Sequence, residues 1–156
     1  MFSSVNVHNH LQELDIPHEM FKIPERSVNI EQAALAVGLE AHQLARVELY
    51  RIDGEASIVI TPADRKVDEE KLRNVVGAAG VERVHSEEIA SLTGYVSWAI
   101  PPVGLKTAMP AYIDYYTLRE EVVYTGSGEP TAILKIRSYD LVRATGGETV
   151  DIIMDE

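Results

Sequence analysis

The chain has few side chains suited to reaction chemistry, and its most constrained segment is the loop at 93–104. Gly94, the adjacent Pro101 and Pro102, and Gly104 restrict the backbone there. Proline donates no backbone N–H and holds φ near about −65°, so the segment has to leave any strand ladder and present backbone groups. We expect such a loop to line a binding site. A rigid exit from a strand, without chemistry, is the alternative.

Residue types exclude several familiar reactive centres. The chain has no cysteine, which rules out disulfides, thiolate metal sites and a cysteine nucleophile. Gly126-Ser127-Gly128 is not a nucleophile elbow, because Thr125 stands where that motif needs a glycine, and its serine is typical of a turn. Among the five histidines, His8 and His10 point to different helix faces and His18 is isolated in sequence. With no Walker loop or dinucleotide-binding glycine motif either, we expect no metal and no cofactor.

The elements that position these residues are predicted from periodicity, caps and turns. Clustered strands in the second half favour an α/β fold of α+β-like character, with a curved mixed sheet of about seven strands and four or five helices. Helices are expected from a Ser4 cap towards Pro17, from an Asn29–Gln32 capping box to Gly38, from an Asp68 cap to Gly77, from Ser86 to Gly94 and over 138–145; strands are expected over 18–23, 95–100, 111–113, 121–125, 132–136 and 150–153, with a hairpin over 47–60 that turns at Asp53-Gly54.

Length and charge narrow the class of protein. The 156 residues fit one domain, 1–156, that buries enough surface to fold without staples. The N-terminus has no basic and apolar leader pattern and no run is long enough to span a membrane, so we expect a soluble, cytoplasmic protein. A net charge of −11 argues against DNA binding and against broad adhesion to nucleic acid, which depends on Lys and Arg. A local basic spot remains compatible with this charge.

The order and spacing of several motifs resemble the YbaK/ProX-type aminoacyl-tRNA deacylases, which are stand-alone relatives of the editing domain of bacterial prolyl-tRNA synthetases. The resemblance covers nearly the whole chain. It rests on Ala33-Ala34 and Gly38, Thr93-Gly94, Pro101-Pro102-Val103-Gly104, Met109 to Asp114, Gly126-Ser127-Gly128-Glu129-Pro130, Asp140-Leu141 and Thr145-Gly146. It implies the family's fold, a tRNA acceptor end as partner, and a synthetase as a further partner.

The resemblance also implies a site. The family's pocket lysine falls on Arg46, which keeps a permanent positive charge and cannot act as a neutral base. Ala99 and Gly128 are expected to supply backbone amides, so these two and Arg46 form the candidate catalytic set. The candidate substrate-binding residues are Trp98, Pro101, Asp114, Gly126 and Ser127.

The chain departs from the family pattern at three of these positions. Arg46 replaces the lysine, and its alternative is a surface ion pair with Glu48 or Glu55. Trp98-Ala99 replaces two glycines, so the indole either fills the acyl pocket, offers a stacking face, or belongs to the ordinary core. Ser127 replaces a glycine. For Asp114, a turn or helix cap before the next residue is an equal alternative.

Two functions follow as hypotheses. The first is a trans-editing deacylase that hydrolyses the ester of a small amino acid such as Ala, Cys or Ser on a mischarged tRNA. Such an ester is already activated, so orientation of a water and stabilisation of the carbonyl oxygen suffice. The second is a binding module of the same fold that has lost catalysis and binds an aminoacyl-adenosine-like ligand, an amino acid or a protein.

Overall fold

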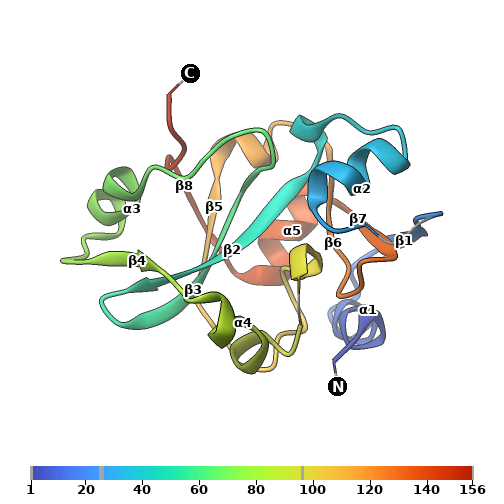
Figure 1. The fold of residues 1–156 in the computed structure, drawn as a ribbon, viewed down its shortest axis with the longest axis horizontal. Coiled ribbons are helices and arrows are strands. Elements are labelled where there is room, and N and C mark those ends of the chain that lie inside the picture. The colour runs from blue at the N-terminus through green and yellow to red at the C-terminus, as the bar shows by residue number, and fades with distance from the viewer. Residues whose placement is uncertain (1, 25–26, 96, 156) are drawn as a thin grey trace.

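The computed structural model describes residues 2–24, 27–95 and 97–155. Within these ranges the chain forms a mixed α/β fold, as the sequence predicts (Figure 1). The α-helices are α1 (Ser4–Glu13), α2 (Ile30–Ala36), α3 (Glu69–Val76), α4 (Ser86–Thr93) and α5 (Ser138–Thr145), and the 3-10 helices are η1 (Ala41–Gln43), η2 (Ser97–Ala99) and η3 (Tyr115–Leu118). The strands are β1 (His18–Lys22), β2 (Ala45–Ile52), β3 (Glu55–Pro62), β4 (Val81–Arg83), β5 (Ala111–Asp114), β6 (Val122–Gly126), β7 (Ala132–Arg137) and β8 (Glu148–Val150).

The strands divide between two sheets. The larger has the order β4-β2-β3-β5-β8, with antiparallel β2–β3 and β2–β4 pairs and parallel β3–β5 and β5–β8 pairs. The smaller is antiparallel, with the order β1-β7-β6. A parallel bridge between Leu44 and Tyr124 connects them, so the start of β2 lies beside β6. The curved mixed sheet expected from the sequence is therefore two sheets joined at one point.

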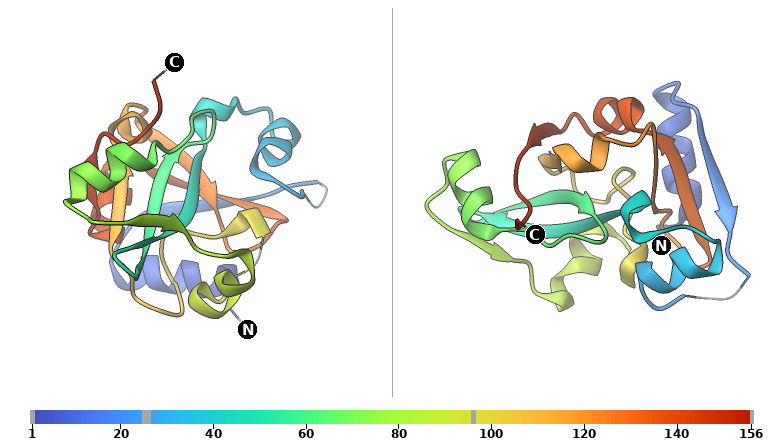
Figure 2. Two further views of the ribbon diagram at one scale, coloured as in Figure 1. Left: turned by 60° about the vertical axis from the view of Figure 1, so that its left-hand side comes forward. Right: turned by 90° about the horizontal axis from the view of Figure 1, so that it is seen from above.

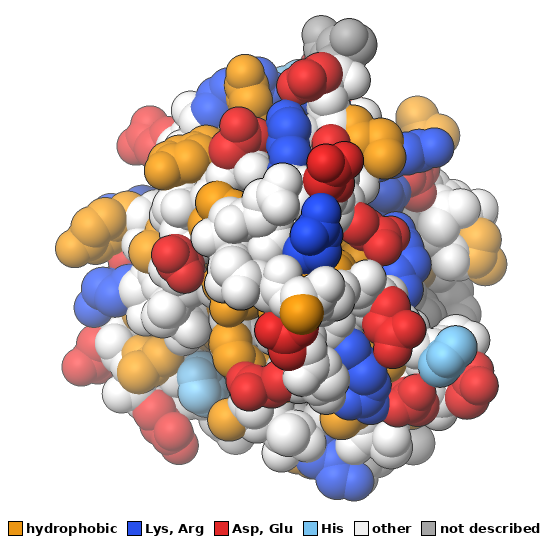
Figure 3. Space-filling view, turned by 90° about the vertical axis from the view of Figure 1, so that its left-hand side faces the viewer, with side chains coloured by type: hydrophobic (Ala, Val, Ile, Leu, Met, Phe, Trp, Pro, Cys, Tyr) orange, Lys and Arg blue, Asp and Glu red, His pale blue; other side chains and the backbone are white. Residues whose placement is uncertain are grey.

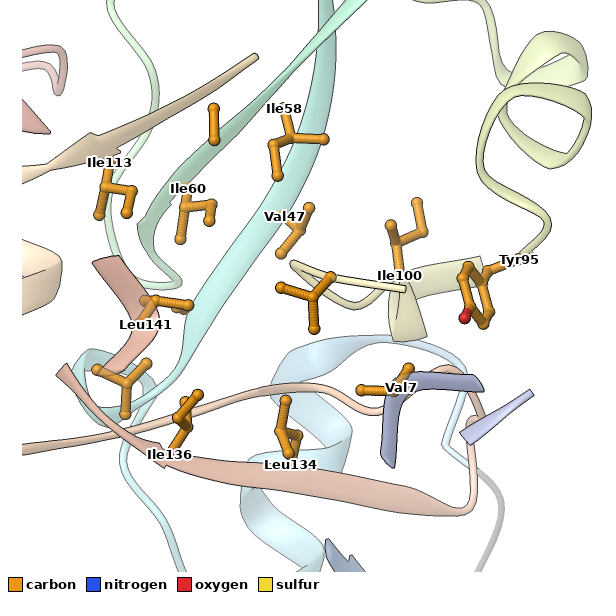
Figure 4. Packing of buried hydrophobic residues seen from close by; sticks show 14 of the residues in the cluster. Val7, Val47, Ile58, Ile60, Tyr95, Ile100, Ile113, Leu134, Ile136 and Leu141 are labelled. Atoms are coloured by element: carbon orange, nitrogen blue, oxygen red, sulfur yellow. The ribbon is translucent and has the colours of Figure 1, made fainter. Parts of the chain in front are cut away.

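The main core lies between the two sheets. In Figure 4, side chains of β2, β3 and β5 point towards side chains of β7, with Leu141 of α5 between them. Figure 2 shows α1 and α5 beside the strands that they cover. The residues labelled in Figure 4 are Val7, Val47, Ile58, Ile60, Tyr95, Ile100, Ile113, Leu134, Ile136 and Leu141.

Local sequence signals account for most element ends. Asp53 and Gly54 have φ of 51° and 84° at the hairpin turn, the left-handed pair that a tight hairpin needs. Asp68 caps α3 by accepting hydrogen bonds from the N–H groups of Glu70 and Lys71. The helix then ends at Gly77 in a left-handed conformation.

Two caps differ from expectation. Ser3, rather than Ser4, caps α1, and it forms a full capping box with Asn6. The side chain of Asn29 accepts a hydrogen bond from the N–H of Gln32, but Gln32 Oε1 accepts from the N–H of Val28 instead of returning to Asn29. The expected capping box at α2 is therefore only half formed.

The segment 95–100 is not the strand that alternation predicts. Val96 lies outside the described residues, and Ser97–Ala99 form the 3-10 helix η2. Alternation fails because the apolar side chains serve different clusters: Ile100 joins the main core, whereas Trp98 packs against α2. The short strand β4, which pairs with β2, has no counterpart in the sequence prediction.

Candidate functional site

Arg46 lies in β2 on the face opposite the main core. Ala45 and Val47 point into that core, so alternation turns the guanidinium to the other side of the sheet. There Arg46 forms an ion pair with Glu31 of α2, and its side chain is 30% exposed. The partner is thus neither Glu48 nor Glu55 as expected from the sequence. Glu48 instead pairs with Arg83, at 2.6 Å.

Thr61 is directly opposite Arg46 in the β2–β3 pair, so the two side chains share a face. It is completely buried, and its Oγ1 has no hydrogen-bond partner among the described residues. Buried hydroxyls are normally paired, because an unpaired one loses its contact with water without compensation. The sequence analysis missed Thr61. The available signal was a polar residue at an otherwise apolar, buried end of β3.

Hydrophobic clusters enclose the Arg46–Thr61 pair on both sides along the strands. On one side, Leu44 and Ala63 belong to a cluster beneath α2. On the other, Tyr50 and Val59 belong to a cluster that packs against α3 and β8. The next side chain of β2 on this face is Glu48, which pairs with Arg83, so the guanidinium and the unpaired hydroxyl lie between an apolar patch and a mixed one.

Trp98 packs against the cluster beneath α2, which includes Ala33 and Leu44. Its indole Nε1 donates a hydrogen bond to the carbonyl of Ser27 at 2.9 Å. Figure 2 shows η2 beside α2. Because Glu31 on the same helix holds Arg46, α2 connects the indole with the guanidinium. The ring is half-buried, fixed at one edge and part of a hydrophobic cluster.

The glycine turn after β6 lies against the end of η2. The N–H of Gly128 donates to the carbonyl of Ala99 at 2.8 Å, so this amide already has a partner. A Cβ on Gly126 would lie 2.2 Å from the carbonyl oxygen of Ile100, far inside contact distance. Only glycine allows this approach of the two backbones. Pro101, which follows, is buried.

Ser127 and Asp114 both have structural partners. Ser127 is buried, and its Oγ lies 3.0 Å and 2.8 Å from the carbonyl oxygens of Glu129 and Ala132, which makes it a turn residue. The Asp114 carboxylate accepts hydrogen bonds from the N–H groups of Tyr116 and Ile152, at 2.9 Å and 2.8 Å. Asp114 thus caps η3, the alternative that the sequence left open.

The candidate residues fall into two groups. Trp98, Ala99, Gly126 and Gly128 contact one another or share a cluster around η2, and a hydrogen bond from Thr125 Oγ1 to the Ala45 carbonyl at 2.9 Å brings β6 to the strand of Arg46. Asp114 lies on β5, on the far side of β3 from the strand of Arg46. The structure therefore brings η2 and the glycine turn together, and it places Arg46 on a neighbouring strand and Asp114 further away on β5.

The loop that carries η2 is anchored by Tyr95. Its hydroxyl donates to the Gly104 carbonyl at 2.7 Å, across the two prolines. Burial raises the pKa of Tyr95 to about 12, so the phenol keeps its proton and continues to donate well into the alkaline range. This hydrogen bond joins residues near the two ends of the loop, so it fixes the distance between them.

Possible metal ligands are scattered over the described ranges. No group of three or more His, Asp or Glu there could hold a metal ion, although His8 Nδ1 lies 2.8 Å from His18 Nε2, a contact between residues that look isolated in sequence. No described helix is both long and apolar enough to cross a membrane.

On the face over α3 and β4, acidic and basic side chains are interspersed (Figure 3).

These contacts define a mixed α/β domain in which a constrained loop meets a glycine turn. A model of the family described as the aminoacyl-tRNA editing domain matches residues 25–144. The chain belongs to this family, which confirms the resemblance inferred from its motifs.

Similar proteins include both synthetases and free-standing chains. The proline–tRNA ligase of Maridesulfovibrio salexigens is 32% identical over 106 residues, which are 68% of this chain and 18% of the ligase. EbsC of Enterococcus faecalis, a candidate Cys-tRNA(Pro)/Cys-tRNA(Cys) deacylase, is 19% identical over 94% of this chain and 91% of its own length. The chain thus spans less than a fifth of the length of the ligases that it matches.

A solved structure extends the likeness to the whole fold. The crystal structure of a candidate trans-editing enzyme for prolyl-tRNA synthetase superposes with a TM-score of 0.88 at 25% identity, over 99% of both chains. The mixed fold expected from the sequence is confirmed by this match.

Proposed function

We propose that this chain is a deacylase that acts in trans on mischarged tRNA and hydrolyses the ester of a small amino acid such as alanine, cysteine or serine. Membership of the editing-domain family supports the reaction class. The observation that carries the proposal is the position of Arg46 directly across the β2–β3 pair from Thr61, whose buried hydroxyl has no partner among the described residues. A positive charge and an unused hydrogen-bonding group can stabilise the charge that develops on an ester carbonyl.

In this reaction a water attacks the ester carbonyl carbon, and negative charge develops on the carbonyl oxygen. The terminal ribose hydroxyl leaves with a proton. Arg46 would stabilise the developing charge, because its guanidinium remains protonated at any physiological pH. It cannot take the proton from the water. A vicinal ribose hydroxyl of the tRNA can assist that transfer, so the protein needs only to position the reactants.

Two parts of the candidate set need a change on binding. Arg46 is paired with Glu31, so the guanidinium would exchange or share this carboxylate when substrate enters. The N–H of Gly128 is bonded to the Ala99 carbonyl, so it would contribute only after that bond opens. Hydrogen bonds of catalytic groups often reach their final geometry only in the complex with substrate. The Ala99–Gly128 contact would then act as a latch on the loop.

The second candidate is a binding module that has lost catalysis. The fixed indole of Trp98 favours it, because this ring stands where the family has a glycine and is held by the Ser27 carbonyl. Such a module would bind the aminoacyl-adenosine end of a tRNA without turnover. For either function we expect the protein to work in the cytoplasm, where tRNA is charged.

The test is release of amino acid from Ala-, Cys-, Ser- and Pro-tRNA, with heat-inactivated protein as the control. Selective release from one substrate establishes the deacylase and its specificity. Binding of a non-hydrolysable aminoacyl-adenosine analogue without release from any substrate establishes the binding module instead.

A further inference from the structure

A second polar site lies near the end of β3, outside the loop arrangement described above. Arg65, Lys71 and Arg119 line a pocket of about 370 Å³ together with Tyr116, Asp151 and Asp155. Three cations against two carboxylates make this pocket locally positive in a chain whose net charge is −11. A local basic spot of this kind is compatible with the acidic net charge of the chain.

Tyr116 organises the two arginines of the pocket. The guanidinium carbons of Arg119 and Arg65 lie 5.3 Å and 5.7 Å from the centroid of its ring, which is the range of cation–π contact. Stacking on an aromatic ring uses the flat face of the Arg119 guanidinium and leaves its N–H edge available for an anion. Two guanidinium groups beside one ring also repel each other, so an anion between them would be stabilising.

The three cations differ in the ion pairs and hydrogen bonds that they already make. Lys71 is bonded to Asp155 at 3.1 Å and lies 3.6 Å from Asp151, and the Asp155 hydrogen bond raises its pKa. Arg65 donates to the Met154 carbonyl. Arg119 is exposed, and it has no carboxylate within ion-pair distance among the described residues. Arg119 is therefore the cation best placed to receive a new anion.

The pocket lies at the same end of the β2–β3 hairpin as Arg46. Thr61, opposite Arg46, is only four residues before Arg65. The element that carries Tyr116, η3, is anchored beside it, since Thr117 Oγ1 lies 3.4 Å from the carbonyl oxygen of Ile60. Alternation in β2 and β3 puts Arg46 and Thr61 on the face that packs against α3, the helix of Lys71.

We propose that this pocket, called here the Tyr116 pocket, binds a backbone phosphate of the single-stranded 3′ end of a tRNA whose last nucleotide reaches Arg46. This inference rests on the proposed function, because it supplies the contact that a terminal nucleotide alone lacks. A guanidinium edge pairs with two phosphate oxygens at once, which gives register to a flexible strand. The charge of the rest of the chain then disfavours binding elsewhere.

The test uses deacylated tRNA, so that binding is measured without turnover. Affinity is titrated at several salt concentrations for the unmodified protein, Arg119→Ala and Arg119→Lys. We expect Arg119→Ala to weaken binding by roughly 3–10-fold and to lower the slope of log K against log salt by about 0.7, the value for one phosphate on a single strand. Arg119→Lys keeps the charge and should lie between the two.

The matched control is Arg73→Ala, which removes the same charge from an exposed position of α3 that does not line the pocket. Equal effects of Arg119→Ala and Arg73→Ala would overturn the proposal, because only general charge would then matter. An inorganic phosphate titration separates the sources of the anion. Phosphate binding that depends on Arg119, with tRNA binding that does not, would also overturn it and assign the pocket to free phosphate.

A kinetic measurement tests phosphate binding at the Tyr116 pocket separately from the proposed deacylase activity. With a mischarged tRNA that the protein hydrolyses, Arg119→Ala should raise KM and leave kcat unchanged, and hydrolysis of a short aminoacyl-adenosine ester should not change. Full activity of Arg119→Ala on tRNA would refute the pocket and leave the deacylase intact. A protein without turnover whose tRNA binding still depends on Arg119 would refute the deacylase and keep the pocket.

Discussion

At the proposed site, the surroundings of Arg46 and Thr61 decide which chemistry is open to it. Arg46 provides a permanent charge that Glu31 holds in place, and Thr61 provides a buried hydroxyl without a partner. Neither can act as a base of ordinary strength, so we expect catalysis here to depend on charge stabilisation and orientation.

Replacement of Arg46 tests the charge. We expect Arg46→Ala to lower kcat/KM for deacylation by on the order of 10²–10³-fold, the typical effect of losing one stabilising donor at a developing oxyanion. Arg46→Lys should recover part of this loss. The control is Arg83→Ala, which breaks the comparable Arg83–Glu48 pair of the same sheet. Unchanged turnover in Arg46→Ala would show that Arg46 has no catalytic role.

Replacement of Thr61 separates stability from function. Thr61→Val keeps the shape and removes a buried hydroxyl that has no partner, so we expect urea unfolding to give an equal or higher free energy of unfolding. Thr125→Val is the matched control, because it deletes a buried hydroxyl that does bond, to the Ala45 carbonyl, and should cost roughly 1–3 kcal/mol. Equal losses in both variants would mean that Thr61 has a partner in solution. Loss of activity in a stable Thr61→Val protein would place its hydroxyl in the substrate site.

At the scale of elements, the crossing of β6 with the end of η2 holds the site loop. Gly126 lets the two backbones meet, the Gly128–Ala99 hydrogen bond fastens them, and Tyr95 closes the loop on Gly104. The loop is therefore positioned by backbone contacts more than by side chains that a sequence pattern would reveal.

Gly126→Ala tests this crossing. The added Cβ would lie 2.2 Å from the Ile100 oxygen, so we expect thermal or urea unfolding to show a loss of about 1–3 kcal/mol, the usual range for overpacking, or more. Gly80→Ala is the control, because a Cβ there meets nothing within 4 Å. A stable Gly126→Ala protein would mean that β6 and the loop separate easily. The latch suggested for the Ala99–Gly128 contact would then be loose in the free protein.

At the scale of the whole molecule, buried tyrosines tie stability to alkaline pH. Burial raises the pKa of Tyr50 and that of Tyr95 to about 12, above the ordinary value of 10.0. Between these values the folded chain keeps protons that the unfolded chain has lost, so stability is complete below about pH 10 and falls as the pH rises to about 12.

The measurement is urea unfolding at several pH values across that window, with tyrosinate absorbance as a second readout. Tyr50→Phe removes one of the phenols with a raised pKa, so its free energy of unfolding should fall less steeply with pH than that of the unmodified protein. A decline of the same steepness in Tyr50→Phe would assign the alkaline loss to other groups.

Element types and most element ends were predictable because their causes are local. The Asp53-Gly54 turn, the Asp68 cap and the left-handed Gly77 and Gly94 each follow from residues within one turn of the chain. The strand expected at 95–100 was wrong, because alternation reports which side chains are buried but not that Trp98 and Ile100 enter different clusters.

The site was predictable in part. The motif pattern located the loop at η2 and the glycine turn, and it placed Arg46 on a strand beside them. The partners were not predictable: Glu31 instead of Glu48 or Glu55 for Arg46, and backbone amides for Asp114. Each of these contacts depends on how elements approach one another, which spacing along the chain does not specify.

The sequence by itself determined the family, the mixed fold, most of the caps and turns, and the acidic net charge, since each of these is set by residue type and near neighbours. Only the tertiary structure decided that Thr61 is buried without a partner opposite Arg46, and that Arg65 and Arg119 meet at Tyr116. The physical reason is range. Caps and turns involve residues within a few positions of one another, whereas burial and charge pairing depend on contacts between segments that are far apart in the chain until it folds.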